Sequence, residues 1–453
     1  MEKQNRFLAM LMFLLFAFFL GSFLVDQAEE RIASFIVLFL GVAFSFIYLV
    51  QIVEASKFGF LIRMFFFALA LRVLLAFLLH YFSQYGMFAE DDYYYNRVAW
   101  RIAQSWKGNY IGNVLADIDP VALGTVKEVA YGYFLGAIFY VFGNVPLAAK
   151  MTSCVIGSLT VVYLSLFTWE IFGEKPARTM AYLTACFPSM ILWSSLALKD
   201  PIATFCIVFA VHKACHLLSR FSSMDLIKMG IALGILGLMR GYMFILVGGC
   251  VALSFALRKR EHLVRNYAIG IIFLGILFFV YQYSGFGRAY VEQASFEQMD
   301  YYRKSLATGG SAIHVDADIS SPGKALMYLP IGVTYFLFAP FPWAIRGLRQ
   351  LVTLPEVLVW YVMFYFFILG MREGLKVHFQ KIAPILSVMV LITLTYSLIE
   401  GNLGTAYRHR AQIMGFYLMF TAFGIHLYRE RKGKERELVR QKRNNRFPVI
   451  PRP

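Results

Sequence analysis

Long apolar runs constrain this chain more than any other feature of its sequence. Twelve stretches are candidates for membrane-spanning helices: residues 7–25, 33–53, 60–82, 147–172, 177–198, 202–218, 229–239, 242–257, 267–283, 357–371, 382–399 and 413–428. A helix needs about 20 apolar residues to cross a bilayer, so 229–239 and 242–257 are short and most of the others suffice. Charged residues make up only 15% of the 453 residues, against about 25% in soluble domains. The sequence therefore predicts an all-α polytopic membrane protein with about 12 transmembrane helices, and it excludes a soluble globular enzyme.

Two further apolar stretches, 131–142 and 325–345, are weaker candidates for crossing the membrane. The first has only twelve residues, and Pro330, Pro340 and Pro342 interrupt the second. Proline breaks the hydrogen-bond ladder of a helix. We therefore expect both stretches to be interfacial or re-entrant helices, the first of them in a long external loop.

The distribution of Lys and Arg orients the chain. With Lys3 and Arg6 inside, twelve crossings return the tail to the same side, and every inside loop then carries a Lys or Arg, as the positive-inside rule requires. Residues 83–130 and 284–324 become long external loops. We expect one transmembrane domain over 1–428 and a basic cytoplasmic tail over 429–453. This tail holds ten Lys or Arg and three Glu, and we interpret it as a topology anchor that contacts anionic lipid, not nucleic acid.

Three consecutive carboxylates, Glu90-Asp91-Asp92, follow the third apolar run and precede three tyrosines. Mutual repulsion and partial burial would raise the pKa of one acid, which suits a general base or a metal ligand. The alternative is a solvated acidic cap on a helix that starts near Tyr93, favoured by the helix dipole. Spacing alone leaves these two interpretations open.

Charged residues also stand at two other external helix ends. In Lys199-Asp200-Pro201 the proline opens a helix, and Asp200 is placed as its N-cap. Lys199 lies on the outside, where the positive-inside bias disfavours it, although a lysine can also simply snorkel at this boundary. Arg240 interrupts an apolar stretch, and such an arginine predicts either a bound anion or a structural ion pair.

The segment from Glu400 to Arg410 places Arg408, His409 and Arg410 directly before the last apolar run. Arginine is suited to bidentate phosphate contacts, and the alternative is a pair of arginines facing lipid headgroups. His212 and His216 are four residues apart near the inner end of a helix, with Cys215 beside them, and we set metal binding by this pair aside. The five cysteines look like core residues.

The four charged segments, at residues 90–92, 199–201, 240 and 400–410, come from distant parts of the chain, yet the topology places all four on one face. Carboxylates for proton abstraction then meet Lys and Arg that can hold a phosphate, next to lipid. This combination is what is needed to transfer a group from a membrane-embedded phosphate carrier to an acceptor hydroxyl.

At these residues the chain resembles the GT-C glycosyltransferases, most closely the bacterial family-39-like branch related to protein O-mannosyltransferases and lipid A aminoarabinose transferases. Glu90-Asp91-Asp92 and the tyrosines resemble the acidic motif of the first large external loop. Residues 131–143 resemble the juxtamembrane helix of the family, and 188–201 resemble a helix end that faces donor phosphate. Residues 404–410 resemble segments of bacterial surface-polysaccharide membrane proteins. The resemblance covers roughly residues 60–425.

The resemblance implies an inverting glycosyltransferase on the external face of a bacterial inner membrane, in surface polysaccharide or glycoconjugate synthesis. The donor is a polyprenyl-phosphate-linked sugar, and the acceptor is a hydroxyl of a glycan, lipid or protein. Asp91 is the expected base, with Asp92 or Glu90 in support. The residues expected to hold the donor phosphate are Lys199, Arg240, Arg408, His409 and Arg410. Those expected to contact substrate are Tyr94, Tyr95, Asp200, Tyr301 and Glu400. A divalent cation at the acids is the one cofactor left open.

Two other functions stay open at this point. An oligosaccharide polymerase or O-antigen ligase also uses external arginines, on a polyprenyl-diphosphate donor. A flippase of lipid-linked sugars would need polar groups near the bilayer midplane, and Arg72 and Glu170 lie inside apolar runs. The acidic motif after residue 83 favours the monosaccharide transferase.

Overall fold

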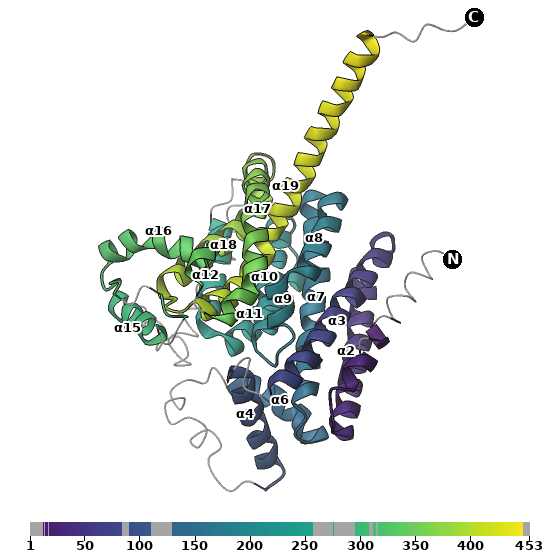
Figure 1. Ribbon diagram of the computed structural model, residues 1–453, viewed down its shortest axis with the longest axis vertical. Helices are drawn as coiled ribbons and strands as arrows, with labels where there is room; N and C mark the ends of the chain where they lie inside the picture. Colours follow the sequence, from purple (N-terminus) through teal and green to yellow (C-terminus); the bar gives the residue numbers. More distant parts are fainter. Residues whose placement is uncertain are drawn as a thin grey trace, which may run out of the picture.

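The computed structural model describes residues 12, 14–16, 18–83, 90–109, 129–256, 275, 295–307, 311–313, 316–345 and 347–446 (Figure 1). These residues are almost entirely helical and include no β-strand, only one isolated bridge between Ala312 and Asn402. Seven of the helices are long and apolar enough to cross a membrane. The protein is therefore an all-α polytopic membrane protein, as predicted.

The helices fall into two groups along the chain. The first group is α2 (Ala28–Ile52), α3 (Ala55–Ser83), α4 (Glu90–Trp106), α6 (Val129–Phe142), α7 (Pro146–Phe172), α8 (Glu174–Cys186), α9 (Pro188–Trp193), α10 (Asp200–Ser219), α11 (Ser223–Met239) and α12 (Gly241–Ala256). The second group is α15 (Phe296–Leu306), α16 (Pro322–Phe338), the short 3-10 helix η3 (Pro342–Ala344), α17 (Leu348–Val377), α18 (Phe379–Ile399) and α19 (Leu403–Arg446).

The seven long helices correspond to seven of the twelve predicted spans, and they are α2, α3, α7, α10, α17, α18 and α19. The predicted short spans 229–239 and 242–257 are the helices α11 and α12, of 17 and 16 residues. The predicted span 267–283 lies outside the described residues except for Gly275, as do seven of the 19 residues of the predicted span 7–25.

The prediction of one continuous helix over 177–198 is wrong. The chain forms α8, breaks at Phe187, forms the six-residue α9 and then turns into α10. Pro188 accounts for the break, because proline lacks a backbone N–H and favours the first turn of a helix, which is where it stands in α9. The break brings residues 194–199 to the end of the bundle where α10 begins.

The two weaker candidates are also helical. Residues 129–142 form α6, which at 14 residues is too short to span. Within 325–345 the helix α16 contains Pro330 and ends at Phe338, and η3 follows. The acidic motif begins the helix α4 at Glu90 and not near Tyr93, and α4 packs on α6.

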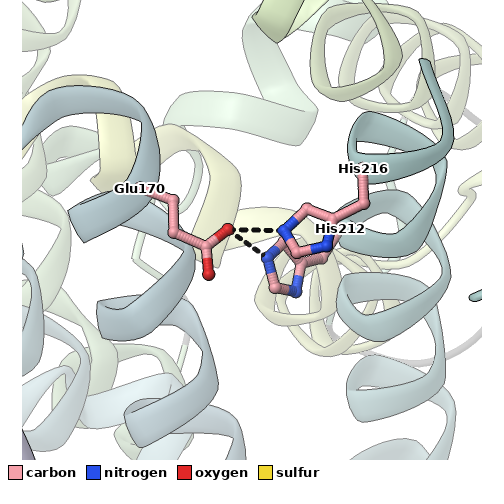
Figure 2. Close-up of side chains that lie close together, drawn as sticks. All are labelled: Glu170, His212 and His216. Carbon is pink, nitrogen blue, oxygen red and sulfur yellow. Dashed lines mark hydrogen bonds and ion pairs between the residues drawn. The ribbon is translucent and has the colours of Figure 1, made fainter. Parts of the chain in front are cut away.

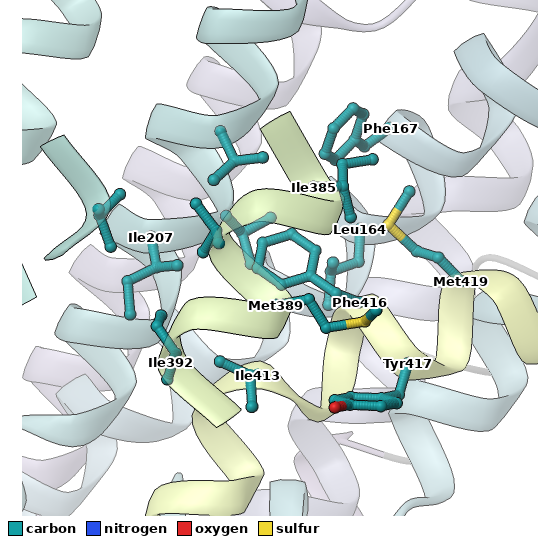
Figure 3. Close-up of a cluster of buried hydrophobic side chains, with 14 of the residues drawn as sticks. Leu164, Phe167, Ile207, Ile385, Met389, Ile392, Ile413, Phe416, Tyr417 and Met419 are labelled. Carbon is teal, nitrogen blue, oxygen red and sulfur yellow. The ribbon is translucent and has the colours of Figure 1, made fainter. Parts of the chain in front are cut away.

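The core lies between α7, α10, α18 and α19. Leu164 and Phe167 of α7 face Ile207 of α10 and apolar side chains of α18 and α19 (Figure 3). Burial of such side chains contributes roughly 1.5–3 kcal/mol each to folding of a water-exposed chain; inside a bilayer, close packing replaces that term as the main attraction between helices.

Two glycines let α17 and α19 approach closely. A Cβ on Gly424 would lie 1.9 Å from the backbone oxygen of Phe366, and one on Gly370 would lie 2.0 Å from that of Phe420. Any side chain at either position would push the two helices apart. Beyond this crossing α19 continues without interruption through most of the basic tail, to Arg446, and projects from the bundle (Figure 1).

The path of the chain sorts the polar residues to opposite ends of the bundle. The beginning of α10, the turn between α11 and α12 and the beginning of α19 lie at the end that also carries α4 and α6. The carboxyl ends of α7 and α10 lie at the other end, toward the projecting part of α19 (Figure 1).

Candidate active site

Asp200 is the centre of a buried charge cluster. Its Oδ1 accepts hydrogen bonds from Arg240 Nη2 at 2.5 Å and from Gln412 Nε2 at 2.6 Å. Its Oδ2 accepts from Arg408 Nε at 2.8 Å, and the residue is only 2% exposed. The prediction that Asp200 is the N-cap of α10 is wrong: Lys199 holds the cap position and Asp200 is the first helical residue. Pro201 stands in the first turn, as predicted.

Arg408 bridges the buried cluster to one exposed acid, Asp91. Its Nε and Nη2 donate to Asp200, and its Nη1 donates to Asp91 Oδ2. The guanidinium carbon also lies 5.8 Å from the centre of the Trp193 ring. The Asp91 side chain is 55% exposed, whereas that of Arg408 is 12% exposed. Asp91 is thus the accessible end of a chain of charges that leads inward to Asp200.

His409 connects Arg240 to Glu400. Arg240 Nη1 donates to His409 Nε2 at 3.0 Å, and His409 Nδ1 contacts Glu400 Oε1. The imidazole stacks on Tyr396 with ring centres 4.4 Å apart. Tyr242 completes this side, since its hydroxyl accepts from Arg240 Nη1 at 2.6 Å. Arg240 therefore holds the turn before α12 against α10 and α19.

Asp92 forms a second pair with Lys150, a residue that sequence reasoning missed. Lys150 Nζ lies 2.9 Å from Asp92 Oδ2, and the two side chains are 1% and 5% exposed. Asp92 Oδ1 also accepts from the backbone N–H of Ala197 at 3.1 Å and from Asn96 Nδ2 at 3.1 Å. These bonds fix the beginning of α4 to α7 and to the turn before α10, which sets the position of the neighbouring Asp91.

Lys199 is buried and its ammonium lies 5.8 Å from the centre of the Tyr95 ring. Tyr95 is itself buried and packs edge-to-face against Tyr94 and Tyr131. The predicted phosphate ligand Lys199 and the predicted substrate residues Tyr94 and Tyr95 therefore lie beside the acidic end of α4. The side chain of Glu90, the third predicted acid, lies outside the described residues.

A small cavity of about 30 Å³, room for about one or two water molecules, adjoins Asp200 and Arg408. Arg72 lines it and donates from Nε to Ser194 Oγ at 2.8 Å. Gly157 makes this approach possible, because a Cβ there would lie 2.4 Å from that of Ser194. The cavity thus brings a third arginine, Arg72, beside Asp200 and Arg408.

Two predicted site residues stand apart from the cluster. Arg410 is buried and donates from Nη1 to the carbonyls of Phe336, Leu337 and Ala339, so it caps the carboxyl end of α16. Tyr301 of α15 is 73% exposed. The structure gives neither residue a hydrogen bond to Asp200, Arg240 or Arg408.

The cluster brings cations and carboxylates together. Among the described residues, the cations are Lys150, Lys199, Arg240 and Arg408, and the carboxylates are Asp91, Asp92, Asp200 and Glu400. Asp91 and Asp92 each face a different cation, so the described acids of α4 do not converge on a common point. A phosphate that displaced one of these carboxylates would meet guanidinium groups that already point at a common position.

The comparisons with known proteins bear on part of the chain. Residues 127–283 match the family described as dolichyl-phosphate-mannose-protein mannosyltransferase. The matched part runs from α6 past α12 and includes Lys150, Lys199, Asp200 and Arg240. No curated protein and no solved structure matches the chain. The match supports a membrane glycosyltransferase of the GT-C superfamily, as the resemblance implied.

Proposed function

We propose that this GT-C-type membrane glycosyltransferase moves a sugar from a polyprenyl-phosphate carrier to an acceptor hydroxyl at the end of the bundle that carries Asp91 and Arg408. One observation carries the proposal. Arg408 joins an exposed carboxylate, Asp91, to a buried carboxylate, Asp200, although the three residues come from α4, α10 and α19. A base and a phosphate-binding cation are thus held side by side.

Arg408 and Arg240 are the groups best placed to bind the carrier phosphate. Both guanidinium groups point at Asp200, and their planar donors suit phosphate oxygens. Lys199 adds a third positive charge nearby. The lipid part of the carrier would lie along the membrane-facing sides of the spanning helices, so only its phosphate and sugar need to enter the cluster.

Asp91 is the proposed general base. In the structure its carboxylate is bound to Arg408, which would keep it from accepting a proton from a substrate. A donor phosphate that occupies Nη1 of Arg408 would release Asp91, whose side chain is already 55% exposed. Donor binding and activation of the base are then one event.

The transfer is a single displacement. The acceptor oxygen loses its proton to Asp91 and forms a bond to the anomeric carbon of the sugar. The bond between that carbon and the phosphate oxygen breaks, and its electron pair leaves on the carrier phosphate. Arg408 and Arg240 stabilise the added negative charge. Attack from the face opposite the leaving phosphate inverts the anomeric carbon.

The orientation follows from the charged ends of the bundle. The basic extension of α19 lies at the end opposite the cluster, and such segments stay on the cytoplasmic side. We therefore place the cluster on the external face of a bacterial inner membrane, where a lipid-linked donor is suited to surface polysaccharide or glycoconjugate synthesis.

The test is transfer by the full chain in proteoliposomes supplied with radiolabelled polyprenyl-phosphate sugars, beginning with the mannose donor that the family description suggests. We expect release of the carrier phosphate by the wild type. Asp91→Asn should lose transfer by at least about 100-fold, in the range of general-base catalysis, while still binding donor. Arg408→Ala should weaken donor binding.

Asp318→Asn is the matched control, because Asp318 is also exposed and cation-paired, to Lys324, but lies outside the cluster. It should transfer at the wild-type rate. Wild-type turnover by Asp91→Asn would remove Asp91 from the role. Movement of the intact donor across the vesicle without release of the carrier would favour a flippase.

A further inference from the structure

We infer that Glu170, His212 and His216 form a zinc site at the end of the bundle opposite the candidate active site. Glu170 lies near the carboxyl end of α7, and the two histidines lie on α10 (Figure 2). His216 and Asp200 are separated by about 24 Å along α10, at 1.5 Å per residue. The site is therefore distinct from the chemistry proposed above.

The three side chains converge on one point. Nε2 of His212 and Nε2 of His216 each lie 2.7 Å from the same oxygen of Glu170, Oε2. The ligand atoms all lie within 4.8 Å of one another. The four-residue spacing places both imidazoles on one face of α10, and they point at the carboxylate of α7, as Figure 2 shows.

This donor set suits Zn²⁺. Two imidazole nitrogens and one carboxylate oxygen, with a fourth position left for water, match the open three-ligand sites that zinc forms in proteins. Soft thiolates are not required, and an all-oxygen set, as Ca²⁺ and Mg²⁺ prefer, is not present here. Without a metal, a proton has to lie between each Nε2 and the shared oxygen Oε2 of Glu170. A divalent ion bound to all three atoms would take the place of these protons.

The second nitrogen of each imidazole also has a partner. His212 Nδ1 lies 2.8 Å from the hydroxyl of Tyr163, and His216 Nδ1 lies 3.7 Å from Asp225 Oδ2. Metal-bound histidines commonly donate their other N–H to such groups, which fixes the tautomer that leaves Nε2 free to bind the metal. Tyr163 thus holds the outer nitrogen of His212 by a hydrogen bond, as in zinc sites, and a carboxylate lies near the outer nitrogen of His216 without bonding to it.

The site is open to an entering ion. The side chains of Glu170 and His216 are 33% and 39% exposed, while that of His212 is 3% exposed. Lys213, the nearest cation on α10, is paired with Asp225 at 3.1 Å, so its charge is compensated. A bound zinc ion would tie α7 to α10 and so stabilise the pair of helices whose other ends carry Lys150 and Asp200.

The test is zinc binding by the full-length protein, purified in detergent with an affinity tag free of histidine, stripped with a chelator and titrated with Zn²⁺ alone. We expect one zinc ion per chain at low micromolar free zinc and a rise in melting temperature. His216→Ala should lose both. Tyr163→Phe should bind about 10- to 100-fold more weakly, because it removes only the outer hydrogen bond. Co²⁺ should give a visible absorption spectrum in the wild type but not in His216→Ala.

His426→Ala is the matched control, since His426 forms a histidine–carboxylate pair with Glu430 at 3.3 Å without a second histidine. It should bind zinc like the wild type. Metal-free melting temperature and elution volume show whether His216→Ala is folded. The proposal fails if the wild type binds no zinc under these conditions, or if His216→Ala binds it as tightly.

Discussion

His409 Nε2 accepts a hydrogen bond of 3.0 Å from Arg240 Nη1, a residue 169 positions away in the sequence. An arginine side chain can only donate, so Nε2 carries no proton and the proton is on Nδ1, which faces Glu400. His409 is therefore a neutral connector with a fixed tautomer. It aligns Arg240 by linking it to a carboxylate of another segment.

This arrangement predicts the effect of removing the connector. His409→Phe keeps an aromatic ring to stack on Tyr396, but it leaves one hydrogen bond of Arg240 and one of Glu400 unmade. We expect a loss of about 1–3 kcal/mol in stability, measured by thermal unfolding in detergent. His409→Gln, which has a donor and an acceptor, should lose less. A smaller loss in His409→Phe than in His409→Gln would contradict this and show that ring stacking on Tyr396 matters more than the two hydrogen bonds.

The Asp92–Lys150 pair predicts a larger effect. Lys150→Met leaves a buried carboxylate without its cation, which costs about 3–5 kcal/mol in comparable cases. The double variant Asp92→Asn/Lys150→Met should recover much of this loss, because the unpaired charge is gone. Arg178→Met, which breaks an exposed pair with Glu174, should cost less than about 1 kcal/mol. Melting temperatures of the three variants in detergent test this order of stability losses.

The crossing of α17 and α19 predicts opposite effects for two glycines of one helix. Gly424→Ala places a methyl group 1.9 Å from a backbone oxygen of α17 and should cost at least about 1–3 kcal/mol. Gly433→Ala, in the projecting part, meets nothing within 4 Å and should stabilise the helix by about 0.5–1 kcal/mol. Thermal unfolding of both variants tests this; similar melting temperatures would contradict the close approach.

Asp300 predicts a pH dependence outside the membrane-spanning helices. Burial alone would raise the pKa of this carboxyl, but hydrogen bonds from Lys304, the N–H of Ile319 and Arg303 lower it below the usual 3.8. A lowered pKa in the folded state gives stability that is present above the unfolded pKa and is lost as pH falls through the folded value. Hydrogen exchange of α15 should therefore speed up as pH falls below about 4, after correction for intrinsic rates. Asp300→Asn should remove that dependence, and an unchanged dependence in this variant would contradict it.

Sequence reasoning found the charged ends of the helices, since polar residues in an apolar chain are conspicuous. It placed Asp91, Asp200, Arg240 and Arg408 on one face through topology alone, and the structure brings these four together. Lys150 was missed because one lysine at the start of an apolar run looks like an ordinary boundary residue. Its partner is 58 positions earlier in the sequence, and no local pattern links the two.

Arg410 shows why part of the site could not be read from spacing. The last span was predicted from residue 413, which left 400–410 as a loop in which neighbouring arginines could aim at one phosphate. The helix α19 in fact begins at Leu403. Residues two apart on a helix point about 200° apart, so Arg408 faces Asp200 while Arg410 faces α16. The residue at which α19 begins decides where the two arginines point, and that residue depends on tertiary contacts more than on local sequence.

The long-range ion pairs of the cluster have an evolutionary consequence. Asp92 is paired with Lys150, and Asp200 with Arg240 and Arg408, each from a distant segment, so replacing one partner alone would leave a buried charge unpaired. Substitutions at such positions are therefore viable chiefly as double changes. In a sequence alignment of homologous proteins, positions 92 and 150 should therefore covary, and so should positions 200, 240 and 408.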